Sequence, residues 1–236
     1  MKVIAHRGAS GERPENTMSA YRLAIEQRAD MIEIDLHRTR DGAIPITHDA
    51  SLEQLGGQGE IADATFTQVR ALDAGDGEHV PQLHEVLDAF GGQIPFNLEL
   101  KIGGRGAYAG LEAIAIAEVE RRGLLSETVF SSFYDGVLAT LRAESAGARI
   151  ALLISRGSAV NWAERARVLR AEALNPELAQ VTPELVRAAH GEGLAVYVFT
   201  VDPLEQMQRM LDLGVDGVFT NHPARLRRLL DSRAIP

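Results

Sequence analysis

Met31-Ile32-Glu33-Ile34-Asp35-Leu36 is a short apolar run with two carboxylates inside it. The alternation predicts a β-strand, because successive side chains of a strand point to opposite faces. Both carboxylates then share one face of the strand, and the two isoleucines share the other. Two acids on one buried face require either a bound cation, a protonated carboxyl group or an ion pair with a neighbouring base.

Similar short apolar runs recur along the chain, and a longer amphipathic stretch follows each of them, so that eight such pairs can be counted. The other expected strands are 3–5, 94–100, 128–131, 149–154, 172–174, 194–200 and 216–220. Strands that alternate with helices favour a parallel sheet, and eight repeats favour closure into a (β/α)8 TIM barrel. The alternative is an open doubly wound sheet, but residues 6–11 lack the Gly-rich phosphate-binding patterns of that fold.

A length of 236 residues suits one domain, residues 1–236. The segment 39–90 lies between the second and third expected strands and is longer than one crossover needs. It contains an Asp41-Gly42 turn and a Gly-rich stretch at 56–59. We therefore expect residues 39–90 to form an insertion with a helical part over one mouth of the barrel.

Composition restricts the partners of the protein. A formal net charge of −9 disfavours nucleic acids and anionic lipid surfaces, so a small-molecule substrate is expected. The absence of Cys excludes disulfides, thiolate zinc sites and cysteine nucleophiles. We expect a cytoplasmic protein without stable membrane insertion, because no secretory leader and no apolar run of ~20 residues is present. The sequence does not indicate the oligomeric state.

The carboxylates form the first candidate site. Glu99 ends the next expected strand, so it converges with Glu33 and Asp35 at the carboxyl ends of the strands, where such barrels carry their reactive groups. Oxygen ligands favour a hard divalent ion, Mg²⁺ or Ca²⁺. The alternative is simple ion pairing: Lys101, two residues after Glu99, could bind a substrate phosphate or neutralise Glu99.

Two histidines and an arginine are candidates for catalysis at the same rim. His6 ends the first strand and His48 ends a short apolar run, and histidine can donate or accept a proton near neutral pH. Arg7 could hold a phosphate with two parallel hydrogen bonds, or could pair with an acid inside the barrel. Structural roles remain open for each of them. Asn16 is expected to cap the helix that follows it, and a role in the site is the second possibility.

Several motifs occur in an order that resembles the glycerophosphodiester phosphodiesterase family. The matching stretches are His6-Arg7-Gly8, Pro14-Glu15-Asn16-Thr17, Glu33-Ile34-Asp35, Asp41-Gly42, His48-Asp49, Glu99-Leu100-Lys101, Leu174-Asn175-Pro176, Phe199-Thr200-Val201-Asp202 and residues 213–220. The match extends over essentially the whole chain.

The resemblance implies a barrel with a small insertion after the second strand, a divalent metal held by Glu33, Asp35 and Glu99, and an acid/base pair formed by His6 and His48. It implies hydrolysis of a glycerophosphodiester to glycerol 3-phosphate and an alcohol through a cyclic phosphate. Arg7 and Lys101 would then stabilise the charge on the phosphate.

The chain departs from the usual family pattern at the mouth of the barrel. Phe199 stands in place of a Trp, Asp202 in place of an Asn, and Asn221 in place of an Asp. We expect Phe199 to form an apolar wall of the substrate site beside the leaving alcohol, with core packing as the rival interpretation. These departures leave the expected metal and histidine positions intact. We therefore expect them to affect substrate preference more than activity.

Three other functions are considered. A lysophospholipase D-like or related lipid phosphodiesterase could use the same barrel, although an aromatic content of 5% is low for membrane insertion. A non-catalytic metal-binding barrel would not need both His6 and His48. A glycosidase with two carboxylates would leave Arg7, Lys101 and the histidines without a role.

Overall fold

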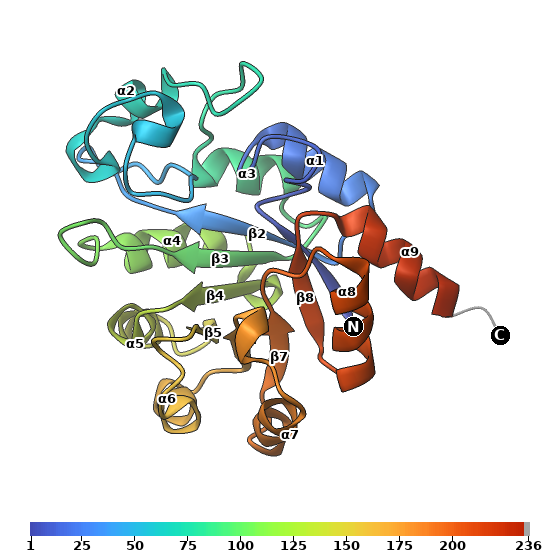
Figure 1. Ribbon diagram of the computed structural model, residues 1–236. Helices are drawn as coiled ribbons and strands as arrows, with labels where there is room; N and C mark the ends of the chain where they lie inside the picture. The colour runs from blue at the N-terminus through green and yellow to red at the C-terminus, as the bar shows by residue number, and fades with distance from the viewer. Residues whose placement is uncertain (234–236) are drawn as a thin grey trace.

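Eight parallel strands close into a barrel in the order β1 to β8, as the computed structural model shows for residues 1–233 (Figure 1). The closed sheet confirms the expected TIM barrel and rules out the open doubly wound sheet. The strands are β1 Lys2–His6, β2 Met31–Leu36, β3 Phe96–Leu100, β4 Thr128–Ser132, β5 Arg149–Ile154, β6 Ala173–Pro176, β7 Ala195–Val198 and β8 Gly217–Thr220.

Three strands differ from the expected bounds by two residues at one end, and three others by a single residue at an end. The third strand begins at Phe96 rather than at residue 94, and the sixth extends to Pro176. The seventh strand ends at Val198, so Phe199 follows the strand instead of lying within it. Phe199 still pairs with Glu177 through an isolated bridge, which keeps its backbone at the rim of the barrel.

Helices form a ring around the sheet (Figure 1). They are α1 Met18–Glu26, α3 Leu83–Phe90, α4 Leu111–Glu120, α5 Asp135–Glu144, α6 Trp162–Leu169, α7 Pro183–Gly191, α8 Leu204–Leu213 and α9 Pro223–Arg233. Pro183 occupies the first turn of α7, where a missing backbone N–H is tolerated. Among residues 1–233, none of the helices is both long enough and apolar enough to cross a membrane.

The alternation in β2 divides its side chains between two cores. Ile32 and Ile34 belong to the large apolar cluster between the sheet and the helices, whereas Met31 belongs to a smaller cluster inside the barrel. Glu33 and Asp35 share the face of Met31 and are 2% and 0% exposed. The strand periodicity therefore turns both carboxylates into the barrel, as expected from the sequence.

The chain between β2 and α3 folds beyond the carboxyl ends of β2 and β3 (Figure 1). It contains the 3-10 turns η1 Glu53–Leu55 and η2 Ile61–Asp63 and the short helix α2 Phe66–Arg70. Its buried apolar side chains form a separate small cluster with Ile61 and Val69 at its centre. His48 lies at the beginning of this segment and therefore depends on a loop, rather than a strand, for its position.

Gly8 is required by the turn that links β1 to the first loop. Its φ of +84° lies in the left-handed region, and an added Cβ would lie 2.7 Å from the carbonyl carbon and the Cβ of Ala20. Both the backbone conformation and the contact exclude a side chain at this position.

We predict that Gly8→Ala lowers the free energy of unfolding by about 2 kcal/mol or more, because a left-handed non-Gly residue alone costs of order 1–3 kcal/mol. Gly136→Ala is the matched control: Gly136 lies in α5 with open space around it, and a helical Gly→Ala change should stabilise by about 0.5–1 kcal/mol. Chemical denaturation measures both. Equal effects of the two substitutions would contradict this account of the turn.

Candidate active site

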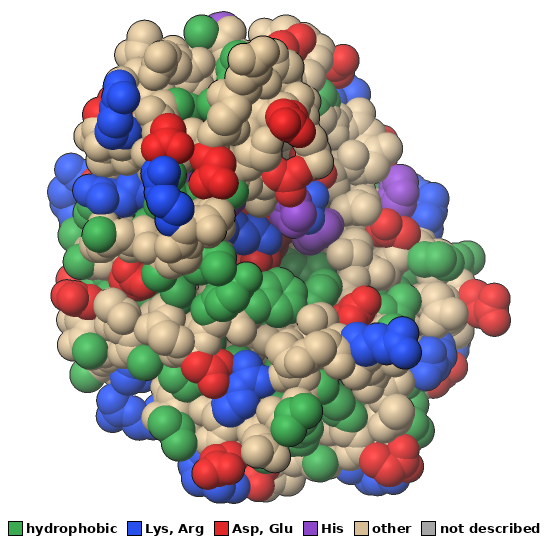
Figure 2. Space-filling view, turned by 60° about the vertical axis from the view of Figure 1, so that its left-hand side comes forward, with side chains coloured by type: hydrophobic (Ala, Val, Ile, Leu, Met, Phe, Trp, Pro, Cys, Tyr) green, Lys and Arg blue, Asp and Glu red, His purple; other side chains and the backbone are tan. Residues whose placement is uncertain are grey.

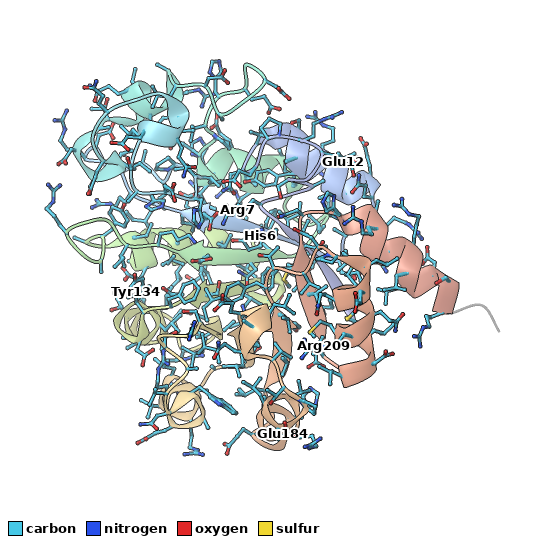
Figure 3. All side chains as sticks on the ribbon, in the orientation of Figure 1. His6, Arg7, Glu12, Tyr134, Glu184 and Arg209 are labelled. Carbon is cyan, nitrogen blue, oxygen red and sulfur yellow. The ribbon has the colours of Figure 1, made fainter. Side chains whose placement is uncertain are left out.

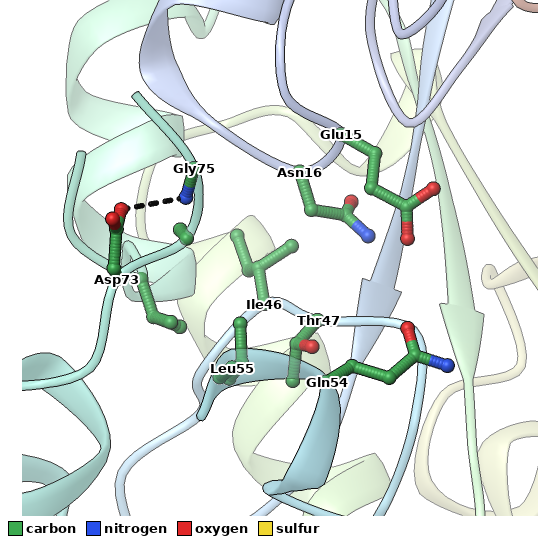
Figure 4. A pocket seen from close by; sticks show the side chains of 10 residues that line it. Glu15, Asn16, Ile46, Thr47, Gln54, Leu55, Asp73 and Gly75 are labelled. Carbon is green, nitrogen blue, oxygen red and sulfur yellow. Dashed lines mark hydrogen bonds between the residues drawn. The ribbon is translucent and has the colours of Figure 1, made fainter. Parts of the chain in front are cut away.

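Two of the cavities near the carboxyl ends of the strands differ in the charge of their linings. The larger, of about 420 Å³, lies between the first loop and the segment after β2 (Figure 4). Within the described residues its lining includes Glu15 and Asp73 but no Lys or Arg. The smaller, of about 260 Å³, is lined by histidines, carboxylates and both a Lys and an Arg. Only the smaller cavity therefore combines acid, base and cationic groups, and we call it the reaction pocket.

The reaction pocket brings together the residues that the sequence singles out. Its lining comprises His6, Arg7, Glu33, His48, Asn97, Glu99, Lys101, Ser131, Phe133, Leu153, Phe199, Thr200 and Phe219. Asp35 is fully buried and bonds to two of the lining cations, Arg7 and Lys101. Figure 2 shows the hollow with His, basic and acidic side chains on one side and apolar side chains on the other, and Figure 3 shows His6 and Arg7 near the barrel axis.

Arg7 links the first strand to the carboxylates of the second. Its backbone N–H donates to Glu33 Oε2 at 2.9 Å, and its side-chain Nε lies 3.2 Å from Asp35 Oδ2. Its Nη1 donates to both carboxylate oxygens of Glu15, at 2.8 and 3.0 Å. The guanidinium is 16% exposed, so it faces the pocket while it is held between two acids.

The three acids form a compact cluster. Glu33, Asp35 and Glu99 each offer an oxygen such that these atoms lie within 4.8 Å of one another. Lys101 Nζ bridges two of them, at 2.5 Å from Glu99 Oε1 and 2.9 Å from Asp35 Oδ1. Glu33 Oε1 is buried and has no hydrogen-bond partner within the described part of the chain. Lys101 is therefore paired with two carboxylates in this structure, and among the described residues Glu33 Oε1 stays without a hydrogen bond.

Burial and neighbouring charges act differently on the acids. Burial raises the pKa of Glu33, and the charges of Asp35 and Glu99 raise it further. Burial also raises the pKa of Glu99, although Lys101 opposes it. For Asp35, Lys101 and Arg7 together outweigh burial and hold the pKa below its usual range. Glu33 is thus the acid that gains most from an added positive charge.

His6 is half-buried at the end of β1 and is oriented by the loop after β8. Its Nδ1 lies 2.8 Å from Asn221 Oδ1, and Asn221 Nδ2 donates to Asp202 Oδ2 at 2.8 Å. Because the amide oxygen can only accept, Nδ1 carries the proton and Nε2 is left as the basic nitrogen. Burial, assisted by the positive charge of Arg7, lowers the pKa of His6 to about 4, so the ring is neutral at pH 7.

His48 has a different environment. Its Nδ1 lies 2.7 Å from Asp49 Oδ1, and its side chain is 38% exposed. The Nδ1 of His48 thus lies beside a carboxylate, whereas the Nδ1 of His6 lies beside an amide oxygen. The two histidines therefore line the same pocket with different hydrogen-bond partners.

Asn16 does not cap α1, and the expectation from the sequence is wrong at this position. Thr17 is the N-cap, and its side chain accepts from the backbone N–H of Ala20. Asn16 adopts a φ of +58° instead and turns its buried amide inward, where Nδ2 donates to Asp35 Oδ2 at 2.9 Å. Thr17 immediately precedes the first residue of α1, so its hydroxyl can accept from the first turn of the helix. The side chain of Asn16 is then available to bond to Asp35.

The remaining wall of the pocket is apolar. The ring of Phe199 packs edge-on against Phe133 at 5.7 Å between centroids and against Phe219 at 6.4 Å. Phe219 belongs to the core inside the barrel, so Phe199 joins the core to the pocket. At the pocket floor Asn97 donates to Ser131 Oγ at 2.7 Å, and its buried Oδ1 has no partner among residues 1–233.

Sequence reasoning missed two buried polar residues next to this pocket. His37 follows β2 and is 1% exposed, and its ring lies 2.7 Å from the hydroxyl of Tyr108. No local pattern marks either residue, because they lie 71 positions apart in the chain. The pairing of β2 with β3 brings these two side chains into contact.

Comparison with known proteins agrees with this geometry. Residues 6–225 match the model of the glycerophosphoryl diester phosphodiesterase family. A glycerophosphodiester phosphodiesterase of Caldanaerobacter subterraneus subsp. tengcongensis is 34% identical over 97% of this chain and 97% of its own length. One from Bacillus subtilis is 31% identical over 94% of this chain and 83% of its own length.

A solved structure has the same fold and similar length. The Oleispira antarctica phosphodiesterase, in complex with the product sn-glycerol-3-phosphate, superposes with a TM-score of 0.84 at 29% identity. The match covers 98% of this chain and 97% of that one. With the family model matching nearly the whole chain and a relative above 30% identity, this protein belongs to the glycerophosphoryl diester phosphodiesterase family.

Proposed function

We propose that this protein hydrolyses glycerophosphodiesters to glycerol 3-phosphate and an alcohol, with His6 and His48 as acid/base catalysts beside a divalent metal. One observation carries the proposal: a single pocket of about 260 Å³ is lined by both histidines, two cations and the carboxylates of Glu33 and Glu99, and the buried Asp35 offers an oxygen within 4.8 Å of theirs. A phosphodiester needs all of these groups, because its cleavage moves two protons and builds negative charge on the phosphate.

The metal would be held by Glu33, Asp35 and Glu99. The partnerless Glu33 Oε1 supports this, since a buried carboxylate oxygen without a partner is costly unless a cation occupies the space beside it. An all-oxygen donor set favours Mg²⁺ or Ca²⁺. When bound, such an ion stabilises the charge that develops on phosphate oxygens.

The charges support a monoanionic substrate. Three carboxylates outnumber Arg7 and Lys101 by one when all are ionised. A divalent cation would reverse the sign of that balance and leave one positive charge, which equals the single negative charge of a phosphodiester. Asn97 Oδ1 offers an acceptor for a hydroxyl group, which suits glycerol.

The reaction then proceeds in two steps. Neutral His6 takes the proton of a glycerol hydroxyl through Nε2, and that oxygen attacks phosphorus while the bond to the leaving alcohol breaks. His48 gives its proton to the departing oxygen. In the second step His48 removes a proton from water, and the water oxygen attacks phosphorus while the P–O bond formed in the first step breaks. His6 returns its proton to the glycerol oxygen that departs, which leaves glycerol 3-phosphate. Arg7 and Lys101 bind the phosphate oxygens throughout.

We assign the roles from the state of His6 and the needs of the reaction. His6 pairs with an amide and is neutral, so it begins as the base. Cleavage also needs a proton donor for the leaving oxygen, and His48, the other histidine of the pocket, takes that role.

A lipid phosphodiesterase is the second candidate, favoured by one feature. Phe133 lines both the reaction pocket and a shallow, mainly apolar groove that includes Tyr134 and Val160, which are 46% and 74% exposed. Such a groove could accommodate an acyl chain. Release of the head-group alcohol from lysophospholipid, without turnover of glycerophosphocholine, glycerophosphoethanolamine or glycerophosphoglycerol, would favour this activity.

We predict that His6→Ala and His48→Ala each lower the turnover number on glycerophosphodiesters by ~10² to 10⁴-fold, the usual contribution of general acid/base catalysis. A glycerol phosphodiester with a nitrophenol leaving group needs no proton from an acid. It should therefore restore turnover in His48→Ala but not in His6→Ala. Rescue of His6→Ala instead would reverse the two roles, and near-normal turnover of both variants would exclude them.

We predict that Mg²⁺ or Ca²⁺ raises the melting temperature of the protein in the absence of substrate. An ion that binds only the folded state stabilises that state by about 2.7 kcal/mol when its free concentration is 100 times its Kd. Glu33→Gln should abolish the shift. Glu112→Gln is the control, since Glu112 is also buried, at 5% exposure, but lies in α4 outside the pocket. An unchanged shift in Glu33→Gln would remove Glu33 from the metal site.

We predict that Phe199→Ala changes the relative kcat/KM values for glycerophosphocholine, glycerophosphoethanolamine and glycerophosphoglycerol. The half-buried ring forms part of the pocket wall, so its removal should cost less stability than the ~3–5 kcal/mol of a core Phe→Ala change. Substrate competition assays and chemical denaturation measure the two effects. An equal loss on every substrate, together with the full core cost, would assign Phe199 to packing alone.

A further inference from the structure

His37 is a buried histidine that the reaction described above does not use. It follows β2 directly, is 1% exposed and makes two hydrogen-bond contacts through its ring. Its Nε2 lies 3.1 Å from the backbone carbonyl oxygen of His48, and its Nδ1 lies 2.7 Å from the hydroxyl of Tyr108. The ring thus touches the backbone of one proposed catalyst and a residue from the loop after β3.

The chemistry of the partners determines the direction of both hydrogen bonds. A carbonyl oxygen can only accept, so Nε2 carries the proton and donates it to His48. Nδ1 is then the bare nitrogen and accepts from the hydroxyl of Tyr108. With the proton on Nε2 and a lone pair on Nδ1, the neutral ring satisfies both hydrogen bonds.

Tyr108 is itself held in place. It is 9% exposed, and its ring packs edge-on against that of His37 at 5.6 Å. The hydroxyl lies beside the turn formed by Gly103 and Gly106, where an added Cβ at Gly103 would be 3.1 Å from it. Burial raises the pKa of Tyr108, so the hydroxyl keeps the proton that it donates to His37.

His48 needs such support because it lies on a loop. The backbone N–H of Thr47 donates to the carbonyl of Asp35 at 3.2 Å, which ties the loop to β2 just before His48. The hydrogen bond from His37 Nε2 then holds the backbone carbonyl of His48 itself. Without it, the 38%-exposed ring of His48 would be anchored mainly through Asp49, its own neighbour in the chain.

We propose that His37 and Tyr108 are positioning residues that hold His48 at the distance from the substrate required for proton transfer. This inference rests on the proposed function, in which His48 is a catalyst. It adds a connection between the loop after β3, which also carries Lys101, and the segment after β2. Neither residue is expected to touch the substrate, because within the described residues neither lines the reaction pocket.

The experiment is a double-mutant cycle between His37 and His48. His37→Leu removes both hydrogen bonds at similar volume, and His37→Gln keeps an amide that can still donate to the His48 carbonyl. A misplacement of about 1 Å can cost ~10²-fold in rate, so His37→Leu should lower kcat on glycerophosphocholine by ~10 to 100-fold with little change in KM. His37→Gln should recover most of that loss.

The cycle separates positioning from general damage. In a His48→Ala background, His37→Leu should cause no further loss of kcat, because the group that it positions is already absent. Tyr108→Phe is the second variant in case His37→Leu folds poorly: it removes one oxygen atom, and its smaller loss of kcat should also vanish in the His48→Ala background.

The outcomes distinguish this inference from the function on which it rests. A full rate for His48→Ala would remove both the catalytic role of His48 and the positioning role of His37. A normal loss for His48→Ala, combined with an equal fold-loss from His37→Leu or Tyr108→Phe in both backgrounds, would overturn the positioning role alone.

Discussion

Three carboxylates buried in one apolar barrel are the constraint on which the site depends. Ionised acids in such a place repel one another and lose their hydration, so each must be compensated by a fixed positive group, a hydrogen-bond donor or a bound cation. Lys101 and Arg7 compensate Asp35, and Lys101 also contacts Glu99. Glu33 receives a backbone N–H, but its other oxygen has no hydrogen-bond partner within residues 1–233, and such a cluster could hold a divalent ion.

Barrel closure makes this concentration of charge possible. All strands run in the same direction, so their carboxyl ends meet at one rim, and the side chains that alternate inward there come from different strands. Deeper in the barrel the same inward positions are apolar, as Ile4 and Met31 show. The apolar layer supports the polar one from below and keeps water from reaching it from that side.

The two histidines show how neighbouring loops set chemical roles. His6 is attached to a strand end and is oriented through Asn221 by Asp202, from the far end of the chain. His48 is attached to a loop and is oriented by Asp49 from its own segment and by His37 through its backbone. The ring of His6 thus pairs with an amide oxygen and the ring of His48 with a carboxylate, so fixed neighbours orient both rings at the pocket.

Much of the fold and the charged residues of the pocket could be predicted from local pattern. Alternation in β2 places Glu33 and Asp35 on one face, and repetition of strand and helix predicts the barrel. Strand ends were less predictable, as Phe199 shows, because the last hydrogen bonds of a strand depend on its neighbours. The helix cap was assigned to Asn16 instead of Thr17, since either side chain can cap a helix and only the turn geometry selects one.

The order of neighbouring residues is enough to predict the strand periodicity, the shared face of Glu33 and Asp35, and the types of group available for catalysis. Which groups become partners depends on the closed barrel, which also brings Glu99 beside Asp35. Asn16 meets Asp35 across 19 positions, His37 meets Tyr108 across 71, and His6 meets Asn221 across 215. Hydrogen bonds act over about 3 Å, so such pairs form only when barrel closure brings distant segments together.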